Sequence, residues 1–361
     1  MSTAARFFAK VYTLAGTFRA PVIDESLLLG VPTIVREINK PAGSVELNLA
    51  YPFDNFGYST AIDVGNLVKV YAVNENNKTG LLVYQGFIEE IDGTFSANSN
   101  TVTLRIFPID ALMDRSLWKS GGSYIVTYAA GDVDTIFSDA IDAMNLIYGT
   151  YFTKNLGNPG LTLNQTFTRQ THLAAMNAAA KSLVDGWYWR IRANGQVDLA
   201  QFNDSTPTHS LTVGKDIDTI HVVKSALNLK NKLVVSWGAG PTDTEYSDAT
   251  SITNYGQRMA LISDSGINDL ATANTKGNGQ LGQLKNIITK TEIIVNAQYP
   301  IETILPGDTV KIQNVTNNTS QMVTGVLRVL RTEYNGATCS LHLGDILDNF
   351  GNELGLLLND Q

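Results

Sequence analysis

The feature that most constrains the fold is a stretch of strand-like sequence that occurs twice. VGNLVKVYAVN (64–74) resembles PGDTVKIQNVT (306–316), and the matched positions are Gly65/Gly307, Val68/Val310, Lys69/Lys311 and Val70/Ile312. Two later segments repeat in the same order, with 85–91 against 324–330 and 101–106 against 338–343. The copies differ in length only in Asn-, Thr- and Ser-rich loops, where insertions cost little. This predicts two similar small β-barrels at the two ends of the chain, with chance similarity among short strands as the alternative.

Between the two copies the sequence changes to a helical period. Apolar residues from Val133 to Met144 recur at i, i+3, i+4, i+7, which predicts an amphipathic helix with Asp132 and Asp134 placed to cap it. Leu173, Met176, Ala180 and Leu183 predict a second helix, which Thr168 or Thr171 can cap and Gly186 can end. Asn194-Gly195 then predicts a tight hairpin, since both positions of such a turn favour positive φ.

These patterns predict an α+β fold that is mainly β. With 361 residues the chain exceeds the size of one hydrophobic core. We expect a first β-barrel over 1–115, an α+β insertion over 116–210, and a second β-barrel over 211–345 that includes a long helix at 266–289. An apolar C-terminal tail over 346–361 would complete the chain.

Charge and cysteine content exclude several classes of protein. The formal net charge of −8 argues against a surface that binds phosphate backbones, because that affinity comes from clustered Lys and Arg. The single cysteine, Cys339, rules out an intramolecular disulfide framework and favours a buried apolar residue over a nucleophile. No apolar run is long enough for a membrane-spanning helix.

One literal dinucleotide-binding fingerprint lies in TKGNGQLG, where Gly277, Gly279 and Gly282 form G-x-G-x-x-G and Glu302 follows at a suitable distance. A functional loop of this kind must follow a strand directly and open a helix. Here the apolar spacing from Ile267 to Ile288 runs straight through the glycines, with Asp264 or Ser265 as a plausible cap. The pattern therefore predicts glycines in mid-helix, where another segment approaches closely, and no cofactor is expected.

No other residue pattern assembles a catalytic or metal site. The four histidines are scattered singly, and Asp132, Asp134, Asp139 and Asp142 suit the start and solvent face of a helix rather than a calcium loop. Nothing pairs a nucleophile with a base, so we expect no enzyme and no bound metal. Trp187, Tyr188 and Trp189 could stack on bases or sugars, but core packing of the hairpin is favoured.

We predict instead that the glycine-bearing helix and the apolar end of the chain are interfaces. Small residues on a helix allow tight apposition of a barrel or a neighbouring subunit, and an apolar terminus needs a covering surface, either its own barrel or a partner. The residues expected in these contacts are Ile267, Leu270, Gly277, Gly279, Leu281, Gly282, Leu284, Leu354, Leu357 and Leu358.

Taken in order, these residues resemble the baseplate hub or tail-tip hub proteins of tailed bacteriophages, the family that includes late control protein D and the hub portion of tail-associated proteins. The resemblance rests on the two barrels with their G-[ND]-x-V-K motifs, on the helix and hairpin THLAAMNAAAKSLVDGWYWRIRANGQVDL, and on NKLVVSWG (231–238). It rests most heavily on YSDATSITNYGQRMALISDSGINDLATA (246–273). Two departures are the lack of an appended peptidoglycan hydrolase and the unmatched apolar tail.

The resemblance implies a structural virion protein, made in the host cytoplasm and located at the distal end of the phage tail. It implies a homotrimer whose six barrels join a hexameric distal tail or tail-tube protein to a threefold spike, fibre or tape-measure protein. DNA would pass through the ring without specific binding, which suits the acidic charge. The alternative is a receptor- or carbohydrate-binding tail component that uses Trp187, Tyr188 and Trp189.

Overall fold

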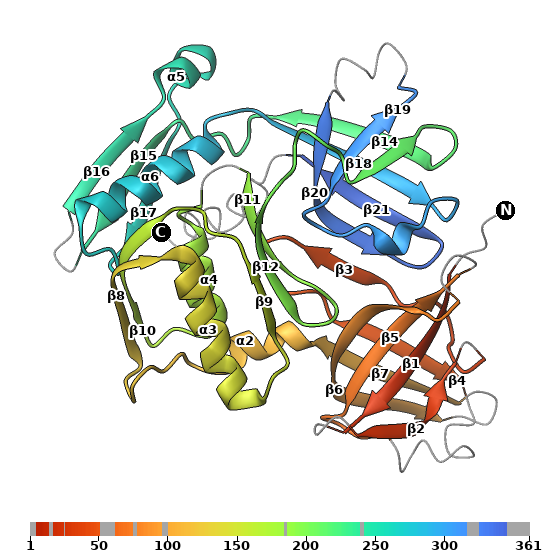
Figure 1. Cartoon of the computed structure of the whole chain (residues 1–361). Coiled ribbons are helices and arrows are strands. Elements are labelled where there is room, and N and C mark those ends of the chain that lie inside the picture. Colours follow the sequence, from red (N-terminus) through yellow and green to blue (C-terminus); the bar gives the residue numbers. More distant parts are fainter. Residues whose placement is uncertain are drawn as a thin grey trace.

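The computed structural model describes residues 5–13, 17–24, 26–50, 62–74, 78–95, 100–183, 186–238, 242–315 and 325–344. In these ranges the chain is α+β and mainly β, as predicted. The two large sheets lie on one side of the molecule in Figure 1, and most of the helices lie on the other. No helix among the described residues is long and apolar enough to cross a membrane.

The first large sheet is antiparallel, with the strand order β2-β1-β5-β6-β7-β4. Its strands are β1 (Arg6–Tyr12), β2 (Phe18–Ile23), β4 (Val45–Ala50), β5 (Leu67–Val73), β6 (Leu81–Phe95) and β7 (Asn100–Pro108). In β7 the alternation of Val102, Leu104 and Ile106 buries all three side chains, because successive residues of a strand point to opposite faces. The period-two pattern in the sequence is thus confirmed.

The second large sheet has the order β13-β19-β20-β21-β18-β14, and β3 pairs with β20 beside β19. Its strands are β3 (Ile34–Glu37), β13 (His209–Thr212), β14 (Ile217–Ser225), β18 (Ile288–Asn296), β19 (Thr309–Gln313), β20 (Val326–Tyr334) and β21 (Thr338–Leu343). A short 3-10 helix, η3 (Ile301–Thr303), precedes β19. Since β3 comes from the N-terminal part of the chain, it runs between the two sheets in Figure 1 and joins them.

The two sheets repeat one arrangement in detail. Strands β5-β6-β7-β4 of the first correspond to β19-β20-β21-β18 of the second. Gly65 N–H donates to the Ile88 carbonyl at 2.7 Å, and Gly307 N–H donates to the Val329 carbonyl at 2.8 Å. A bulge follows in each copy, between Ile88 and Glu90 and between Val329 and Arg331.

This hydrogen bonding corrects one part of the sequence alignment. Ile88 corresponds to Val329 rather than to Leu327, so the middle pair of segments is displaced by two residues. The first and third pairs keep their predicted register, since Ile88 lies opposite Ile106 and Val329 lies opposite Leu343. Short apolar strands tolerate such a shift in an alignment, because the side-chain period is two and apolar residues still match apolar ones.

One hydrophobic cluster extends through both sheets. The rings of Phe7 and Tyr334 lie 5.7 Å apart between their centroids, and Ala5 N–H donates to the Gly336 carbonyl at 2.9 Å. Gly336 has a φ of +81°, and a Cβ there would meet the Phe7 ring. The two sheets are therefore packed directly against each other.

The helix-hairpin unit lies between the sheets in sequence and has its own core. Its elements are η2 (Ile109–Ala111), α2 (Leu112–Arg115), β8 (Ile125–Asp132), α3 (Val133–Tyr148), β9 (Thr153–Leu156), β10 (Thr162–Thr168), α4 (His172–Ala180), β11 (Trp187–Ile191) and β12 (Gln196–Gln201). The predicted stripe of α3 is fully buried. Thr171 caps α4 as predicted, but the Asp132 carboxylate accepts from the Thr162 hydroxyl instead of capping α3.

A further small unit, residues 232–284, separates β14 from β18 in sequence. It consists of β15 (Lys232–Trp237), β16 (Thr242–Ser247), α5 (Ala249–Tyr255), β17 (Met259–Asp264) and α6 (Leu270–Leu284), with the sheet order β16-β15-β17. Helix α6 is shorter than the predicted 266–289. It starts later because Asp269, rather than Asp264 or Ser265, caps it by accepting from Thr272 N–H at 2.7 Å, and it ends earlier because Ile288 begins β18. The predicted domain boundaries stay a prediction.

Candidate functional site

The three glycines of the literal fingerprint lie inside helix α6, as the apolar spacing predicted. A Cβ at Gly277 would overlap the ring of Tyr246, and one at Gly279 would lie 3.2 Å from the Ser182 carbonyl. Gly282 meets nothing within 4 Å. The turn between a strand and a helix that a dinucleotide loop needs is not formed at these glycines. Their close neighbours belong to β16 and to the residues just after α4 within the same chain.

Most residues of the predicted interface are buried inside the chain. Ile267, Leu281 and Leu284 belong to the core that α6 forms with β15 and β16. Leu270 is different, because 52% of its surface is exposed. That these residues contact another subunit stays a prediction, and the accessible members of the helix set are the exposed Leu270 and the half-buried Gly282. Leu354, Leu357 and Leu358 lie outside the described residues.

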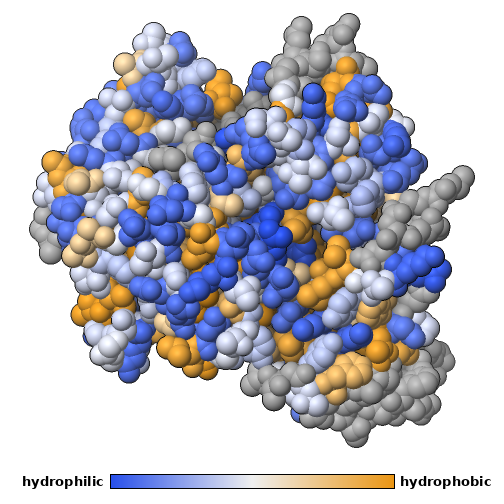
Figure 2. Space-filling view, in the orientation of Figure 1, coloured by the Kyte–Doolittle hydropathy of each residue, from blue (hydrophilic) through white to orange (hydrophobic). Residues whose placement is uncertain are grey.

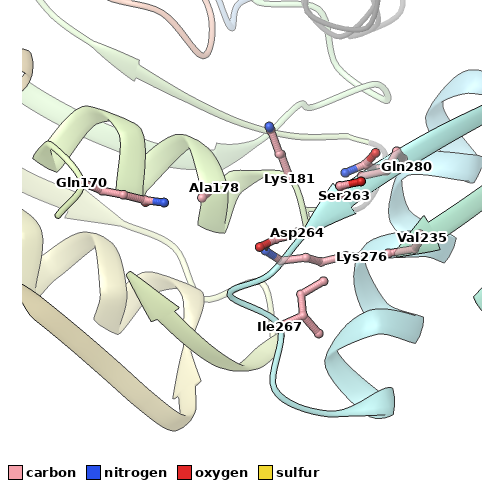
Figure 3. Close-up of a pocket in the computed structure, with 10 residues that line it drawn as sticks. Gln170, Ala178, Lys181, Val235, Ser263, Asp264, Ile267, Lys276 and Gln280 are labelled. Atoms are coloured by element: carbon pink, nitrogen blue, oxygen red, sulfur yellow. Dashed lines mark hydrogen bonds and ion pairs between the residues drawn. The ribbon is translucent and has the colours of Figure 1, made fainter. Parts of the chain in front are cut away.

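A polar pocket lies where α4, β17 and α6 meet (Figure 3). It encloses about 200 Å³ and is lined by both polar and apolar side chains. Lys276 extends from α6 toward Asp264, and its ammonium donates to the Asp264 carboxylate at 3.0 Å and to the side-chain oxygen of Gln165. Gln165 lies on β10, so this lysine connects the helix-hairpin unit to the unit 232–284.

Burial governs the chemistry of Lys276. Only 3% of the residue is exposed, and desolvation lowers the pKa of its ammonium, while the charge of Asp264 opposes that shift. Because two hydrogen-bond acceptors are in place, the geometry suits a structural clamp better than a nucleophile. We missed this residue in the sequence, although a lysine on the same helical face as Ala273, Gln280 and Leu284 is a usable signal.

A second buried ionic cluster attaches the hairpin β11–β12 to the second sheet. Arg190 donates to the Asp198 carboxylate at 2.9 Å and lies 3.1 Å from the Asp308 carboxylate. His209 Nε2 lies 3.0 Å from the other oxygen of Asp308. Burial raises the pKa of Asp308, but the hydrogen bond with His209 and the charge of Arg190 outweigh it, so the pKa is lowered overall. Asp308, in the turn next to Gly307, therefore links the hairpin to the second sheet through charged hydrogen bonds.

A third cluster lies beside β3, where both sheets and the hairpin meet. Burial raises the pKa of Asp110 to about 7 and lowers the pKa of Arg36 to about 10. Ala42 N–H donates to the Asp110 carboxylate at 2.7 Å. An open cavity of about 350 Å³ is lined here by Arg36, Arg192 and Glu302, among others. Glu302, the acid considered for the fingerprint, instead accepts from the side-chain amide of Asn74.

The aromatic run of the hairpin is mainly core. Trp189 is completely buried, Tyr188 packs on Phe202 with ring centroids 4.4 Å apart, and Trp187 is half-buried. Cys339 is also buried, and burial raises the pKa of its thiol to about 12. These side chains are structural, as the sequence favoured. Among the described residues, no group of three or more His, Cys, Asp or Glu side chains is placed to hold a metal.

The surface offers separate apolar residues rather than one large patch on the face in Figure 2, where hydrophobic groups alternate with hydrophilic ones. Among the large apolar side chains that the structure describes, Leu146 at the end of α3 and Leu227 after β14 are the most exposed, at 88% and 86%. The buried ionic clusters link the units of the chain to one another, and the exposed apolar residues are available for contacts with other proteins. They do not define a catalytic centre in the part of the chain that the structure describes.

The fold is similar to those of three proteins described as tail proteins. One from Neisseria meningitidis is 15% identical, has a TM-score of 0.64, and is matched over 94% of this chain and 96% of its own. The 43 kDa tail protein of prophage MuSo2 from Shewanella oneidensis is 13% identical, with a TM-score of 0.64 and coverage of 94% and 98%. Prophage tail protein gp18 from Listeria monocytogenes is 10% identical, with a TM-score of 0.59 and coverage of 93% and 94%.

No protein-family model and no curated protein sequence matches the chain. The structural similarities nevertheless extend over almost the full length of both partners in each comparison. The chain therefore has the fold of phage and prophage tail proteins, which is the class that the sequence resemblance predicted.

Proposed function

We propose that this chain is a structural component of a phage or prophage tail, and that it forms a trimeric hub at the tail tip or baseplate. The observation that carries the proposal is the match of the whole fold to tail proteins over 93–94% of the chain. Clusters at the joints between units support a rigid load-carrying role, because they hold the units to one another through buried charges.

The repeated sheets support the trimeric arrangement. A hub that connects a sixfold tube to a threefold spike or fibre needs six similar units from three chains, and the two sheets of this chain share turn, bulge and strand order. Contacts that repeat head to tail around a closed ring supply such an assembly. Its partners would be a distal tail or tail-tube protein on one side and a spike, fibre or tape-measure protein on the other.

We further propose that the ring lines the channel through which DNA leaves. A net charge of −8 favours passage without specific binding, since an acidic wall repels phosphates. The chain would be made in the host cytoplasm and then assembled into the virion. A receptor- or carbohydrate-binding role that uses Trp187, Tyr188 and Trp189 is less favoured, because Trp189 is completely buried, Tyr188 is buried against Phe202, and Trp187 is half-buried.

Two measurements test the proposal. Gold-labelled antibody to this chain should bind particles at the distal end of the tail, and sedimentation of the purified chain at high concentration should give three chains per particle. Label along the capsid, or none on intact virions, would refute the tail assignment. A strictly monomeric chain in solution and in the virion would refute the trimer but leave the tail assignment standing.

A further inference from the structure

Strand β6 has an open edge that the corresponding strand of the second sheet does not have. On one side β7 pairs with β6 from Gly86 to Phe95. On the other side β5 pairs with it from Leu81 to Phe87 only. From Ile91 to Thr94, the structure places no strand along this second side among the residues that it describes.

The second sheet shows what the repeated arrangement accepts at that place. There β19 pairs with β20 at Val326–Arg328, and β3 then pairs with Arg331–Tyr334. Because Ile88 corresponds to Val329 and each copy has a bulge immediately afterwards, Arg331–Tyr334 correspond to Glu90–Gly93. The edge that β3 covers in one copy thus has no strand paired with it in the other, within the described part of the chain.

Backbone direction makes the β6 edge competent for pairing. Ile88 directs its N–H and C=O to Asn66 and Gly65, on the β5 side. The bulge adds one residue, so the alternation of a strand brings the N–H and C=O of Ile91 and Gly93 to that same side. Unpaired groups in such a row are a template for another strand.

Exposure agrees with this comparison. Ile91 is half-buried and Gly93 is exposed, whereas their counterparts in the covered copy, Thr332 and Tyr334, are only 2% and 6% exposed. Segment 88–95 contains no Pro or Lys, the residues that commonly block pairing at an edge. Glu89 and Glu90 are already paired with Arg115 and Arg105, whereas Asp92 is exposed and forms no ion pair with any residue that the structure describes.

The matching strand is available at the outer edge of the second sheet. β14 is nine residues long, ends the strand order beyond β18, and exposes Val223 and Lys224. The opposite outer strand, β13, has only four residues. Lys224 could also approach Asp92, which favours β14 by charge.

We propose that the β6 edge at Ile91–Thr94 pairs with β14 of a second copy of this chain. Within one chain, a strand from the N-terminal part extends the second sheet. Between chains, a strand of the second sheet would extend the first sheet of the neighbour, and this head-to-tail contact closes into a ring. The inference rests on the proposed tail-hub function and names the surface through which its copies join.

Cross-linking tests the pairing directly on the full chain. Asp92→Cys and Lys224→Cys chains are mixed at high concentration and treated with a short bis-maleimide, and natural Cys339 stays silent because it is fully buried. We expect Asp92→Cys to cross-link to Lys224→Cys at least ten times faster than to the control Leu146→Cys, which is on an exposed part of α3. Equal rates, or no product, would overturn the proposal.

A backbone variant gives an independent readout. Ile91→Pro removes an N–H from the open edge while its matched control, Ile91→Ala, keeps it. Both should fold, as checked by thermal unfolding, but only the Ala variant should show hydrogen-exchange protection of 88–95 that increases with chain concentration. If both variants lose this concentration-dependent protection, or if protection of 88–95 in the wild type does not increase with chain concentration, the pairing of β6 with β14 is refuted. If the antibody labels the tail but the cross-link does not form, this inference is overturned and the proposed function stands. If the cross-link forms but the antibody does not label the tail, the proposed function is refuted and the pairing of β6 with β14 stands.

Discussion

The two large sheets share a backbone design but differ in what their turns and bulges touch. At the turn, Gly65 has open space around it, whereas Gly307 lies against Tyr188 of the hairpin. At the bulge, Glu89 forms an exposed ion pair, whereas Leu330 is buried with Ile38, Tyr188 and Phe202. At these two positions one copy is thus packed against the hairpin, whereas the other has open space at the turn and an exposed ion pair at the bulge. The difference shows that a duplicated backbone design can bury a position in one copy and leave its counterpart accessible in the other.

The turn glycines should show the largest difference between copies. Both have positive φ, +84° at Gly65 and +93° at Gly307, so alanine at either position costs about 1–2 kcal/mol of stability. Gly307→Ala must also displace the Tyr188 ring, which adds about 1–3 kcal/mol. Denaturant unfolding should therefore give a clearly larger loss for Gly307→Ala than for Gly65→Ala. Equal losses would mean that the second turn is not held against the hairpin.

The bulge residues should show the next largest difference. Leu330→Ala removes a buried side chain from the contact with Tyr188 and Phe202 and should cost about 2–3 kcal/mol. Glu89→Ala loses an exposed pair with Arg115 and should cost less than about 1 kcal/mol. Urea midpoints at neutral pH measure both. If Glu89→Ala were the more damaging variant, the assignment of internal and free bulges would be reversed.

Asn66 and Asp308 occupy the same place in the two turns and allow a smaller, chemical test. Asp308→Asn weakens the joint with Arg190 and His209 and should cost about 2 kcal/mol. Asn66→Asp keeps the side-chain oxygen that accepts from Asp63 N–H and should change stability by less than about 0.5 kcal/mol. A thermal shift in Asp308→Asn no larger than that in Asn66→Asp would exclude a charged joint.

Lowering the pH should reveal the smallest difference in stability between the two turns. The lowered pKa of Asp308 contributes stability that is present above its unfolded pKa of about 4 and is lost as the pH falls through the folded value. Asn66 does not titrate. Amides around Gly307 should therefore lose exchange protection relative to those around Gly65 as the pH decreases from about 5 to about 3. Asp308→Asn should remove this pH-dependent difference, and its persistence would point to another group.

Much of the architecture could be predicted because periodicity reports burial directly. The α3 stripe, the alternation in β7, the repeated strands and the helical frame through Gly277 all follow from apolar spacing. The bounds of helix α6 were less predictable. Asp269 and Asp264 are both residue types that cap helices, but only Asp269 accepts a hydrogen bond from a helix N–H. At the Asn194-Gly195 hairpin the glycine alone has positive φ, so the turn type differs from the predicted one.

The sequence did not predict which distant segments contact each other. Nothing in IVRE indicates that β3 leaves its neighbours and pairs with β20, because strand pairing depends on which edge is open in three dimensions. The glycines at 277 and 279 predicted a close neighbour but not its identity, which is Tyr246 and the Ser182 carbonyl. Lys276 was not predicted as a buried charge, and its partners Gln165 and Asp264 lie on β10 and β17.

The most direct test of the account is cryo-electron microscopy of the tail tip of particles that carry this chain. The account predicts three copies in a ring, with β3 on β20 inside each copy and β14 of one copy along Ile91–Thr94 of the next. A tail tip that lacks the chain, or a ring in which the β6 edge faces solvent, would contradict it.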